Sequence, residues 1–526
     1  MTTISAAARR ASAVGLALTA CLTALPGATA TAADRDGTAM TAGAGLGRYY
    51  HQRLDWKSCV LGPDDATGRG LEEAGARCAD VTVPLDYARP RGRSLKVAIS
   101  RIAATDSRHR AGSLLFNPGG PGGPGLGYSP LVRQVMKETG ARYDVIGFDP
   151  RFVGRSSPLD CGWPVGSSVL SAGPGRAGFE RQVALQKRLA DKCRATNASV
   201  LPYVTTRNTA RDMDVVRGAL GERKISYLGW SYGTYLGTAY TQMFPGHYDR
   251  VVLDGALDPR RYNPRLMRGV ERENEQALAD WAAWAAQRHS VYGLGRTRGQ
   301  VLATVDHVVA ASARHPLTVG TGADTFRLDD TQVPFVVFSG TADDTDEARA
   351  AAGEQMSVLA RAAAGRPTRL SPQFAAVLRG ALTDEGSRNG SAQSAILCGD
   401  VSVPHDPERY WRDIERSRAS HPLFGPLTNN IGPCAFWDRP REKPTQVHHD
   451  TPALIVAATG DPRTPYSGSV ALHELLPSSR LLTLKGANRH ALYGQYGNAC
   501  VDDAVNRYLA TGKLPARDQT CVKRSR

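Results

Sequence analysis

Ser231 lies between two glycines in the run Gly229-Trp-Ser-Tyr-Gly233, a spacing typical of a nucleophilic serine. A β-rich run, residues 225–228, precedes it, and a helix-compatible run, residues 234–244, follows. Such a nucleophile elbow exposes the hydroxyl at the carboxyl end of a sheet and aims the Tyr232 backbone N–H at a developing oxyanion. The alternative is a chance match in a chain with 54 glycines, so the interpretation depends on the partners of the serine.

Asp461 and His490 follow Ser231 in the order serine, acid, base that α/β-hydrolases use. Asp461 comes after an apolar run that predicts a buried strand (452–458), and His490 comes after a second predicted strand (480–484). Taken singly, Asp461 is equally a turn or helix-cap residue, and His490 is one of 12 histidines. Their joint arrangement predicts a triad in which His490 takes the serine proton and Asp461 orients His490.

Two other carboxylates are alternative acids. Asp254 and Asp258 lie near the end of the strand predicted after the elbow, at residues 250–254. They become candidates if Asp461 and His490 act independently of each other.

A loop rich in glycine and proline, residues 117–125, follows a short apolar strand predicted at 113–116. Its glycines let the backbone approach a substrate closely, so we expect the Gly120 N–H to complete an oxyanion hole with Tyr232. A phosphate-binding loop would need a Gly-Lys-Ser/Thr ending, which is absent, and the prolines oppose a flexible linker.

Several stretches together resemble one known family: the elbow, the 117–125 loop, the Asp461 and His490 loops, and residues 83–87, 149–157, 206–221 and 252–255. The chain is similar to the actinomycete tripeptidyl aminopeptidases, secreted α/β-hydrolase peptidases related to the prolyl aminopeptidases. The resemblance covers residues 56–521 and is weakest between 260 and 445. Phe152 and Arg489 stand where the family usually has glycine, and both can reshape the site.

The expected architecture is an α/β-hydrolase domain interrupted by a large, mainly helical cap. We expect a signal peptide at 1–32, the hydrolase domain at 33–258 and 446–526, and the cap at 259–445. Residues 271–287 and 346–366 have helical patterns. Trp281 and Trp284, on the first of these helices, are expected to be core residues rather than binding residues.

The resemblance implies hydrolysis of peptides a few residues from a free N-terminus. We expect no cofactor and no metal. An enzyme that recognises an α-amine needs a carboxylate to pair with the ammonium, and the cap supplies candidates. These are Glu271, Glu273 and Glu275, each of which can equally belong to the solvated face of a helix.

The N-terminus has Arg9 and Arg10, an apolar run at 11–25 and small residues at 28–32, as in a secretory signal peptide. A rival lipoprotein signal would leave Cys21 lipidated at the cell surface. The other eight cysteines suit an oxidising compartment, and Cys-x-x-Cys pairs typical of zinc sites are absent. Proximity and the family resemblance suggest the pairs Cys59 with Cys78, Cys161 with Cys193, Cys398 with Cys434, and Cys500 with Cys521, while other pairings remain open.

The formal net charge of +15 is spread along the chain and forms no basic block, so we expect no nucleic-acid partner. We also expect a monomer without a transmembrane segment that takes peptides with a free N-terminus. The sequence therefore predicts a secreted serine exopeptidase that works through an acyl-enzyme. The alternatives are a secreted carboxylesterase with the same triad and an inactive hydrolase fold kept as a surface binding protein.

Overall fold

The computed structural model describes residues 45–523. The predicted signal peptide and the alternative lipidation site Cys21 lie outside this range. One sheet has the strand order β1-β2-β4-β3-β5-β6-β9-β10-β11. β2 is antiparallel to both of its neighbours, and the other neighbouring pairs are parallel. This mostly parallel sheet with helices on both faces confirms the predicted α/β-hydrolase fold.

The nine described strands of the sheet include the five predicted from the sequence, at 113–116, 225–228, 250–254, 452–458 and 480–484, which agree to within two residues at each end. They are β1 (Arg77–Pro84), β2 (Ser94–Ile102), β3 (Gly112–Asn117), β4 (Tyr143–Phe148), β5 (Ile225–Trp230), β6 (Tyr248–Asp254), β9 (Leu454–Ala458), β10 (Arg480–Lys485) and β11 (Gln519–Val522). The helices outside the β6–β9 connection are α1 (Gly47–Tyr50), α2 (Ala66–Glu73), α3 (Ser129–Val135), α4 (Lys137–Gly140), α5 (Arg176–Asn197), α6 (Thr206–Ala219), α7 (Tyr232–Met243), α17 (Tyr466–Leu475) and α18 (Ala499–Thr511).

Successive side chains of a strand point to opposite sides of the sheet. The central strands are buried on both faces because helices pack against each side. On one face Leu115 and Leu253 pack in the same core as Val216 of α6 and Leu236 of α7. On the other face Leu114 packs in the same core as Val132 of α3 and Val505 of α18. These two layers fix the strand ends that carry the candidate site.

The connection between β6 and β9 is mainly helical, as predicted, and we call its helices α8–α16 the cap. They are α8 (Glu271–Ala286), α9 (His289–Tyr292), α10 (Arg298–Arg314), α11 (Val333–Gly340), α12 (Asp346–Ala363), α13 (Pro372–Leu382), α14 (Ser387–Asp400), α15 (Pro407–Arg418) and α16 (Gly425–Thr428), with a two-stranded sheet of β7 (Leu317–Val319) and β8 (Phe326–Leu328).

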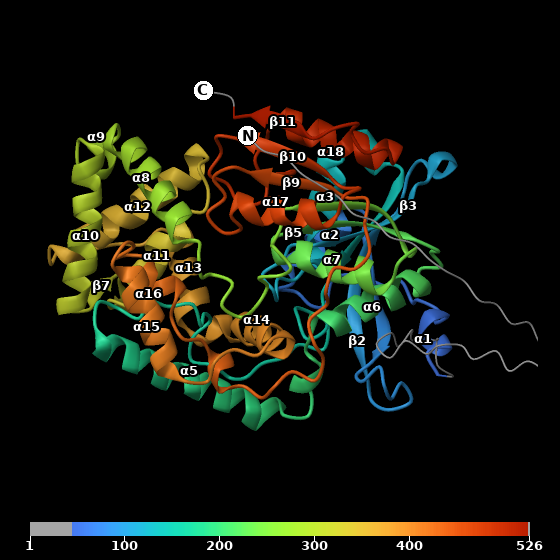
Figure 1. The fold of residues 1–526 in the computed structure, drawn as a ribbon, viewed down its shortest axis with the longest axis horizontal. Helices are drawn as coiled ribbons and strands as arrows, with labels where there is room; N and C mark the ends of the chain where they lie inside the picture. The colour runs from blue at the N-terminus through green and yellow to red at the C-terminus, as the bar shows by residue number, and fades with distance from the viewer. Residues whose placement is uncertain (1–44, 524–526) are drawn as a thin grey trace, which may run out of the picture. The chain divides into compact units, whose positions relative to one another are not determined.

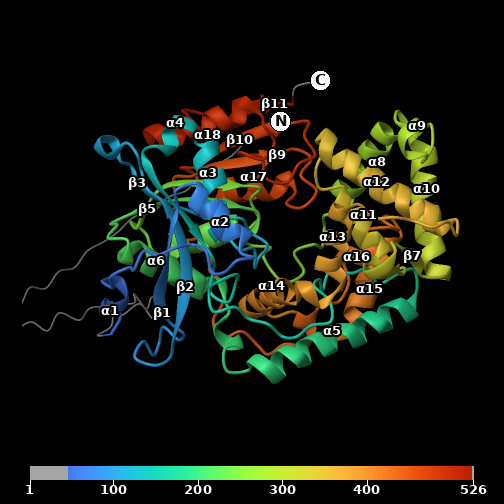
Figure 2. The ribbon, with the colours of Figure 1, turned by 180° about the vertical axis from the view of Figure 1, so that it is seen from behind.

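The cap has a hydrophobic core of its own. Trp281 and Trp284 are buried in it, as expected. In Figures 1 and 2, helices α8 to α12 lie together on the side away from β1 and β2. The domain boundaries at 258 and 445 stay predictions.

Helix α5 precedes the elbow in sequence but packs against the cap. Phe179 of α5 shares a small core with Tyr410 and Ile414 of α15. Arg194 donates to the Phe436 carbonyl at 2.7 Å. The cap is therefore extended by α5, a helix from a separate part of the chain.

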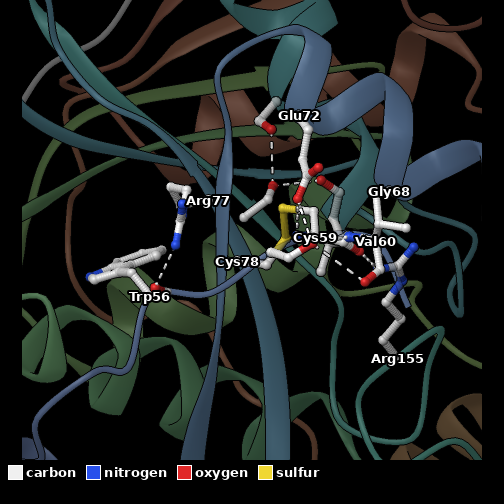
Figure 3. The surroundings of a disulfide bond; sticks show 12 residues. Trp56, Cys59, Val60, Gly68, Glu72, Arg77, Cys78 and Arg155 are labelled. Atoms are coloured by element: carbon white, nitrogen blue, oxygen red, sulfur yellow. Dashed lines mark hydrogen bonds between the residues drawn. A yellow bond between two sulfur atoms is a disulfide. The ribbon is translucent and has the colours of Figure 1, made fainter. Parts of the chain in front are cut away.

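Four disulfides join the pairs expected from the sequence: Cys59–Cys78, Cys161–Cys193, Cys398–Cys434 and Cys500–Cys521. Figure 3 shows the first of them, where the Cys59 carbonyl accepts a hydrogen bond from Arg155 at 2.6 Å. No helix within residues 45–523 is long and apolar enough to cross a bilayer.

Candidate active site

Ser231 occupies a sharp turn between β5 and α7. Its φ is 56°, a strained value for a residue other than glycine. A Cβ at Gly229 would lie 2.5 Å from the Gly233 carbonyl oxygen, and one at Gly233 would lie 2.6 Å from that of Asn117. Neither position has room for a side chain, which is the physical reason for the Gly-x-Ser-x-Gly spacing.

Asp461 and His490 form a hydrogen-bonded pair. The His490 Nδ1 lies 2.9 Å from Asp461 Oδ2 and 3.1 Å from Oδ1, and the carboxylate is only 2% exposed. A proton on Nδ1 that faces the carboxylate leaves Nε2 free to accept a proton from a serine. This is the arrangement expected of an acid and a base.

Thr464, which the sequence analysis missed, completes the hydrogen bonding of the acid. Its hydroxyl donates to Asp461 Oδ2 at 2.8 Å and lies 3.2 Å from His490 Nδ1. The backbone N–H groups of Arg463 and Thr464 donate to Asp461 Oδ1 at 2.8 and 2.9 Å. The Asp-Pro-Arg-Thr run, typical of a turn closed by an aspartate, was the available signal.

The end of β6 joins the elbow to this pair. The Asp254 carbonyl accepts the Ser231 N–H at 2.9 Å. A Cβ at Gly255 would lie 3.4 Å from both Asp461 Oδ2 and His490 Cε1. Within residues 45–523 no hydrogen bond joins Ser231 to His490, a contact that in substrate-free enzymes is often long.

Asp254 and Asp258, the alternative acids, do not bond to the His490 ring. Asp254 Oδ2 accepts the N–H groups of Leu492 and Tyr493 at 2.8 and 2.7 Å, and burial raises the pKa of Asp254 to about 7. Asp258 pairs with Arg260 at 3.0 Å. Asp254 thus anchors the loop that carries His490.

The 117–125 loop lies against the elbow. A Cβ at Gly119 would lie 2.5 Å from the Trp230 carbonyl oxygen and 3.1 Å from the Tyr232 nitrogen. The Gly119 N–H donates to the Asn117 side chain at 3.0 Å, whereas the Gly120 N–H donates to no acceptor within residues 45–523. Of these two glycines, Gly120 has the N–H available for a ligand.

Tyr232 is held by a buried network from the cap. Its hydroxyl lies 2.5 Å from the Thr206 hydroxyl, which donates to Asp400 of α14 at 2.5 Å. Tyr262 also donates to Asp400, at 2.8 Å, and burial raises the pKa of Asp400 to about 6. The backbone beside Ser231 is therefore positioned partly by the cap.

The three cap carboxylates have different surroundings. Glu271 is buried, and its Oε1 accepts from Thr428 at 2.8 Å and Asn429 at 2.6 Å. Glu273 pairs with Arg272 at 2.9 Å. Glu275 is half-buried, lies 3.7 Å from His421 Nδ1, and has its pKa raised by burial.

A cavity connects the oxyanion loop with the neighbourhood of Glu271. Gly120 lines it at one place and Thr428, the hydrogen-bond partner of Glu271, at another. Leu266, Met267 and Leu397 supply part of its apolar wall. Of the three candidate carboxylates, only Glu271 forms a hydrogen bond with a residue that lines this cavity.

The two departures from the family pattern have distinct settings. Phe152 has a φ of 67° and is buried, so it adopts the backbone conformation that glycine takes without strain. The Arg489 guanidinium bonds to Asp343 in the loop between α11 and α12. The sequence offered no signal for that contact.

Comparison with known proteins places the chain in a family. The family described as TAP-like protein matches residues 421–521. A tripeptidyl aminopeptidase from Streptomyces lividans is 36% identical over 487 residues, which cover 89% of this chain and 86% of that protein. The serine protease Hip1 of Mycobacterium tuberculosis is 29% identical over 491 residues, covering 89% and 91%.

A protein named carboxylesterase B from Mycobacterium tuberculosis is 31% identical over 523 residues, covering 94% of both chains. With the α/β-hydrolase sheet, these likenesses confirm a serine hydrolase of the peptidase type. The chain belongs to the tripeptidyl aminopeptidase family of α/β-hydrolases.

Proposed function

We propose that this protein is a secreted serine exopeptidase that hydrolyses peptides near a free N-terminus through an acyl-enzyme. Ser231 attacks the scissile carbonyl while His490 takes its proton and Asp461 stabilises the imidazolium. The N–H groups of Gly120 and Tyr232 stabilise the oxyanion. His490 then protonates the leaving amine, and water releases the acyl group by the same route.

Glu271 is the observation that supports action at a free N-terminus. Its carboxylate is 7% exposed and pairs with no cation within residues 45–523, since its partners are neutral hydroxyl and amide groups. A buried carboxylate of this kind is well suited to an incoming ammonium. Through Thr428 it adjoins the cavity that reaches Gly120, so we favour Glu271 over Glu273 and Glu275 as the amine site.

Two features support secretion. All eight cysteines of the described residues form disulfides, which persist in oxidising compartments. The N-terminal sequence has the charge and apolar pattern of a signal peptide.

The test is kcat/KM for one tripeptidyl anilide with its N-terminus free and then acetylated. Breaking one side of a desolvated charge pair costs roughly 3 to 5 kcal/mol, about two to four decades in kcat/KM. Glu271→Gln should lower activity on the free peptide and leave activity on the acetylated peptide unchanged. Glu273→Gln, at a carboxylate already paired with Arg272, is the matched control.

Equal kcat/KM for the free and acetylated peptides would remove the exopeptidase assignment. The Ser231→Ala variant separates this result from a failure of the triad, because it should lose roughly a million-fold in turnover on either substrate. A folded Ser231→Ala protein that keeps a few per cent of activity would refute the nucleophile.

A carboxylesterase is the second candidate, favoured by the likeness to the mycobacterial protein of that name. An esterase is indifferent to a substrate amine. It would hydrolyse a short acyl nitrophenyl ester faster than the tripeptidyl anilide and would be unaffected by Glu271→Gln.

A further inference from the structure

One segment of the cap contacts both loops of the acid–base pair. Residues 338–344, which we call the clamp segment, comprise the end of α11 and most of the loop before α12. The Phe338 carbonyl accepts from the Arg463 guanidinium, two residues after Asp461. The Ala342 carbonyl accepts the backbone N–H of His490 at 3.3 Å.

Charged side chains strengthen the contact on the His490 side. Asp343 accepts from the Arg489 guanidinium, and the two side chains are only 19% and 15% exposed. Asp344 accepts the Asn488 N–H at 2.9 Å and the Lys523 ammonium at 2.6 Å. Successive acidic residues of the clamp segment thus bond to successive residues of the His490 loop.

Arg489 fixes the backbone on both sides of His490. Besides bonding to Asp343, its Nε donates to the Ala491 carbonyl at 3.1 Å. Ala491 has a φ of 60°, a strained conformation that persists only where neighbouring groups impose it. The sheet holds the next residues, Leu492 and Tyr493, through Asp254, so the loop is tied to the sheet on one side and to the cap on the other.

We propose that Asp343 and Arg489 are positioning residues for His490. Through their ion pair, proton transfer from Ser231 to His490 depends on the contact between the cap and the His490 loop. The proposal rests on the proposed function, in which His490 is the general base. Without the pair, the clamp segment keeps two hydrogen bonds with backbone N–H groups of this loop, in which the Ala342 carbonyl accepts from His490 and Asp344 accepts from Asn488.

The test compares Asp343→Asn, Arg489→Gln and Arg489→Lys in the full-length protein. Each is assayed for the rate of labelling by a small fluorophosphonate, which requires an activated Ser231 but no peptide subsites. Asp343→Asn and Arg489→Gln should lower the labelling rate and kcat by the same factor and leave KM nearly unchanged. A misplacement of about 1 Å can cost up to about 100-fold in rate, and Arg489→Lys should recover part of the loss.

Asp324→Asn is the matched control, because it breaks an ion pair with Arg379 elsewhere in the cap. It should leave labelling and kcat unchanged. The double variant Asp343→Asn with Arg489→Gln should be no worse than either single variant, as expected of two residues that act as a unit.

A folded Asp343→Asn protein labelled at the wild-type rate would overturn the proposal, as would a change confined to KM or strictly additive losses. If a thermal melt shows that Asp343→Asn is not folded, Arg489→Gln and Arg489→Lys give the same comparison. Wild-type protein that is not labelled on Ser231 would instead refute the proposed function, and the positioning role with it.

Discussion

At the scale of single residues, the candidate site depends on carboxylates whose surroundings give them different tasks. Asp461 accepts two backbone N–H groups and a hydroxyl, and faces His490. Asp254 is equally buried but faces backbone N–H groups, and its Oδ1 has no partner within residues 45–523. The first arrangement suits a group that orients His490, whereas burial raises the pKa of Asp254 and its two backbone hydrogen bonds oppose that shift.

Substitutions of the acid and of the base should not have additive effects on activity. Asp461 acts only through His490 in the proposed mechanism, so Asp461→Ala combined with His490→Ala should be little worse than His490→Ala alone. The measurement is kcat/KM for the three variants on one anilide substrate. Additive losses would mean that the two residues act separately, and Asp254→Ala would then be assayed as the acid.

Asp254 should make stability depend on pH. Because its pKa is raised to about 7, the folded protein holds a proton that the unfolded chain has released above about pH 4. Its contribution to the free energy of unfolding is therefore full below pH 4 and is lost as pH rises toward 7. Between pH 5 and pH 8 the loss should be roughly 3 kcal/mol.

Asp254→Asn keeps an acceptor for Leu492 and Tyr493 and removes the titration. Urea unfolding is measured at pH 5, 6, 7 and 8. As pH rises, the free energy of unfolding of the variant should increase relative to that of the wild type. Asp400, whose pKa is raised to about 6, titrates in both proteins and cancels in the difference. Parallel pH dependence of the two proteins would contradict the assignment to Asp254.

At the scale of elements, the sequence was sufficient for the strands and helices that carry the chemistry. The apolar runs before Ser231, Asp461 and His490 form β5, β9 and β10, because these strands are buried on both faces and read as continuous apolar segments. The Glu271 helix begins at its predicted residue. Local pattern decides these features, so local sequence predicts them.

Contacts between distant segments could not be predicted in this way. The bond between Asp343 and Arg489, the Thr464 hydroxyl on the acid, and the packing of α5 on α15 all depend on how layers meet in space. Glu271 could be named from its charge. Its buried position beside Thr428 could not, since charged residues on a helix are usually exposed.

The approach of the 117–125 loop to the elbow gives a prediction at this scale. Gly119 has a φ of 94°, and a methyl group there would lie 2.5 Å from the Trp230 oxygen and 2.8 Å from Ser231 Cβ. Gly119→Ala should therefore push the Gly120 N–H away from the elbow. Losing one oxyanion donor costs about 100- to 1,000-fold in kcat.

Gly70→Ala is the control, because a Cβ at that helical position has nothing within 4 Å. Both variants are compared by kcat on the anilide and by thermal melting. Full activity in Gly119→Ala would rule out the proposed oxyanion loop.

At the scale of the whole molecule, the disulfides close loops within different layers. The bonded cysteines are 19, 32, 36 and 21 residues apart in sequence. In the chain-entropy account each such loop contributes about 3 to 4 kcal/mol, so four together rival the whole stability of a typical domain. Protein made in a reducing cytosol should be poorly folded.

Two of these bonds should have separable effects on stability and activity. Cys398–Cys434 lies in the cap, and Cys434 lines the cavity that reaches Gly120. Cys59–Cys78 instead joins a loop to β1 and lines no part of that cavity. The paired variants Cys398→Ala with Cys434→Ala and Cys59→Ala with Cys78→Ala should both lower the melting temperature. Only the first should also raise KM for the tripeptidyl anilide, because it loosens the cavity wall. Equal KM values in two folded variants would show that this cavity does not hold the peptide.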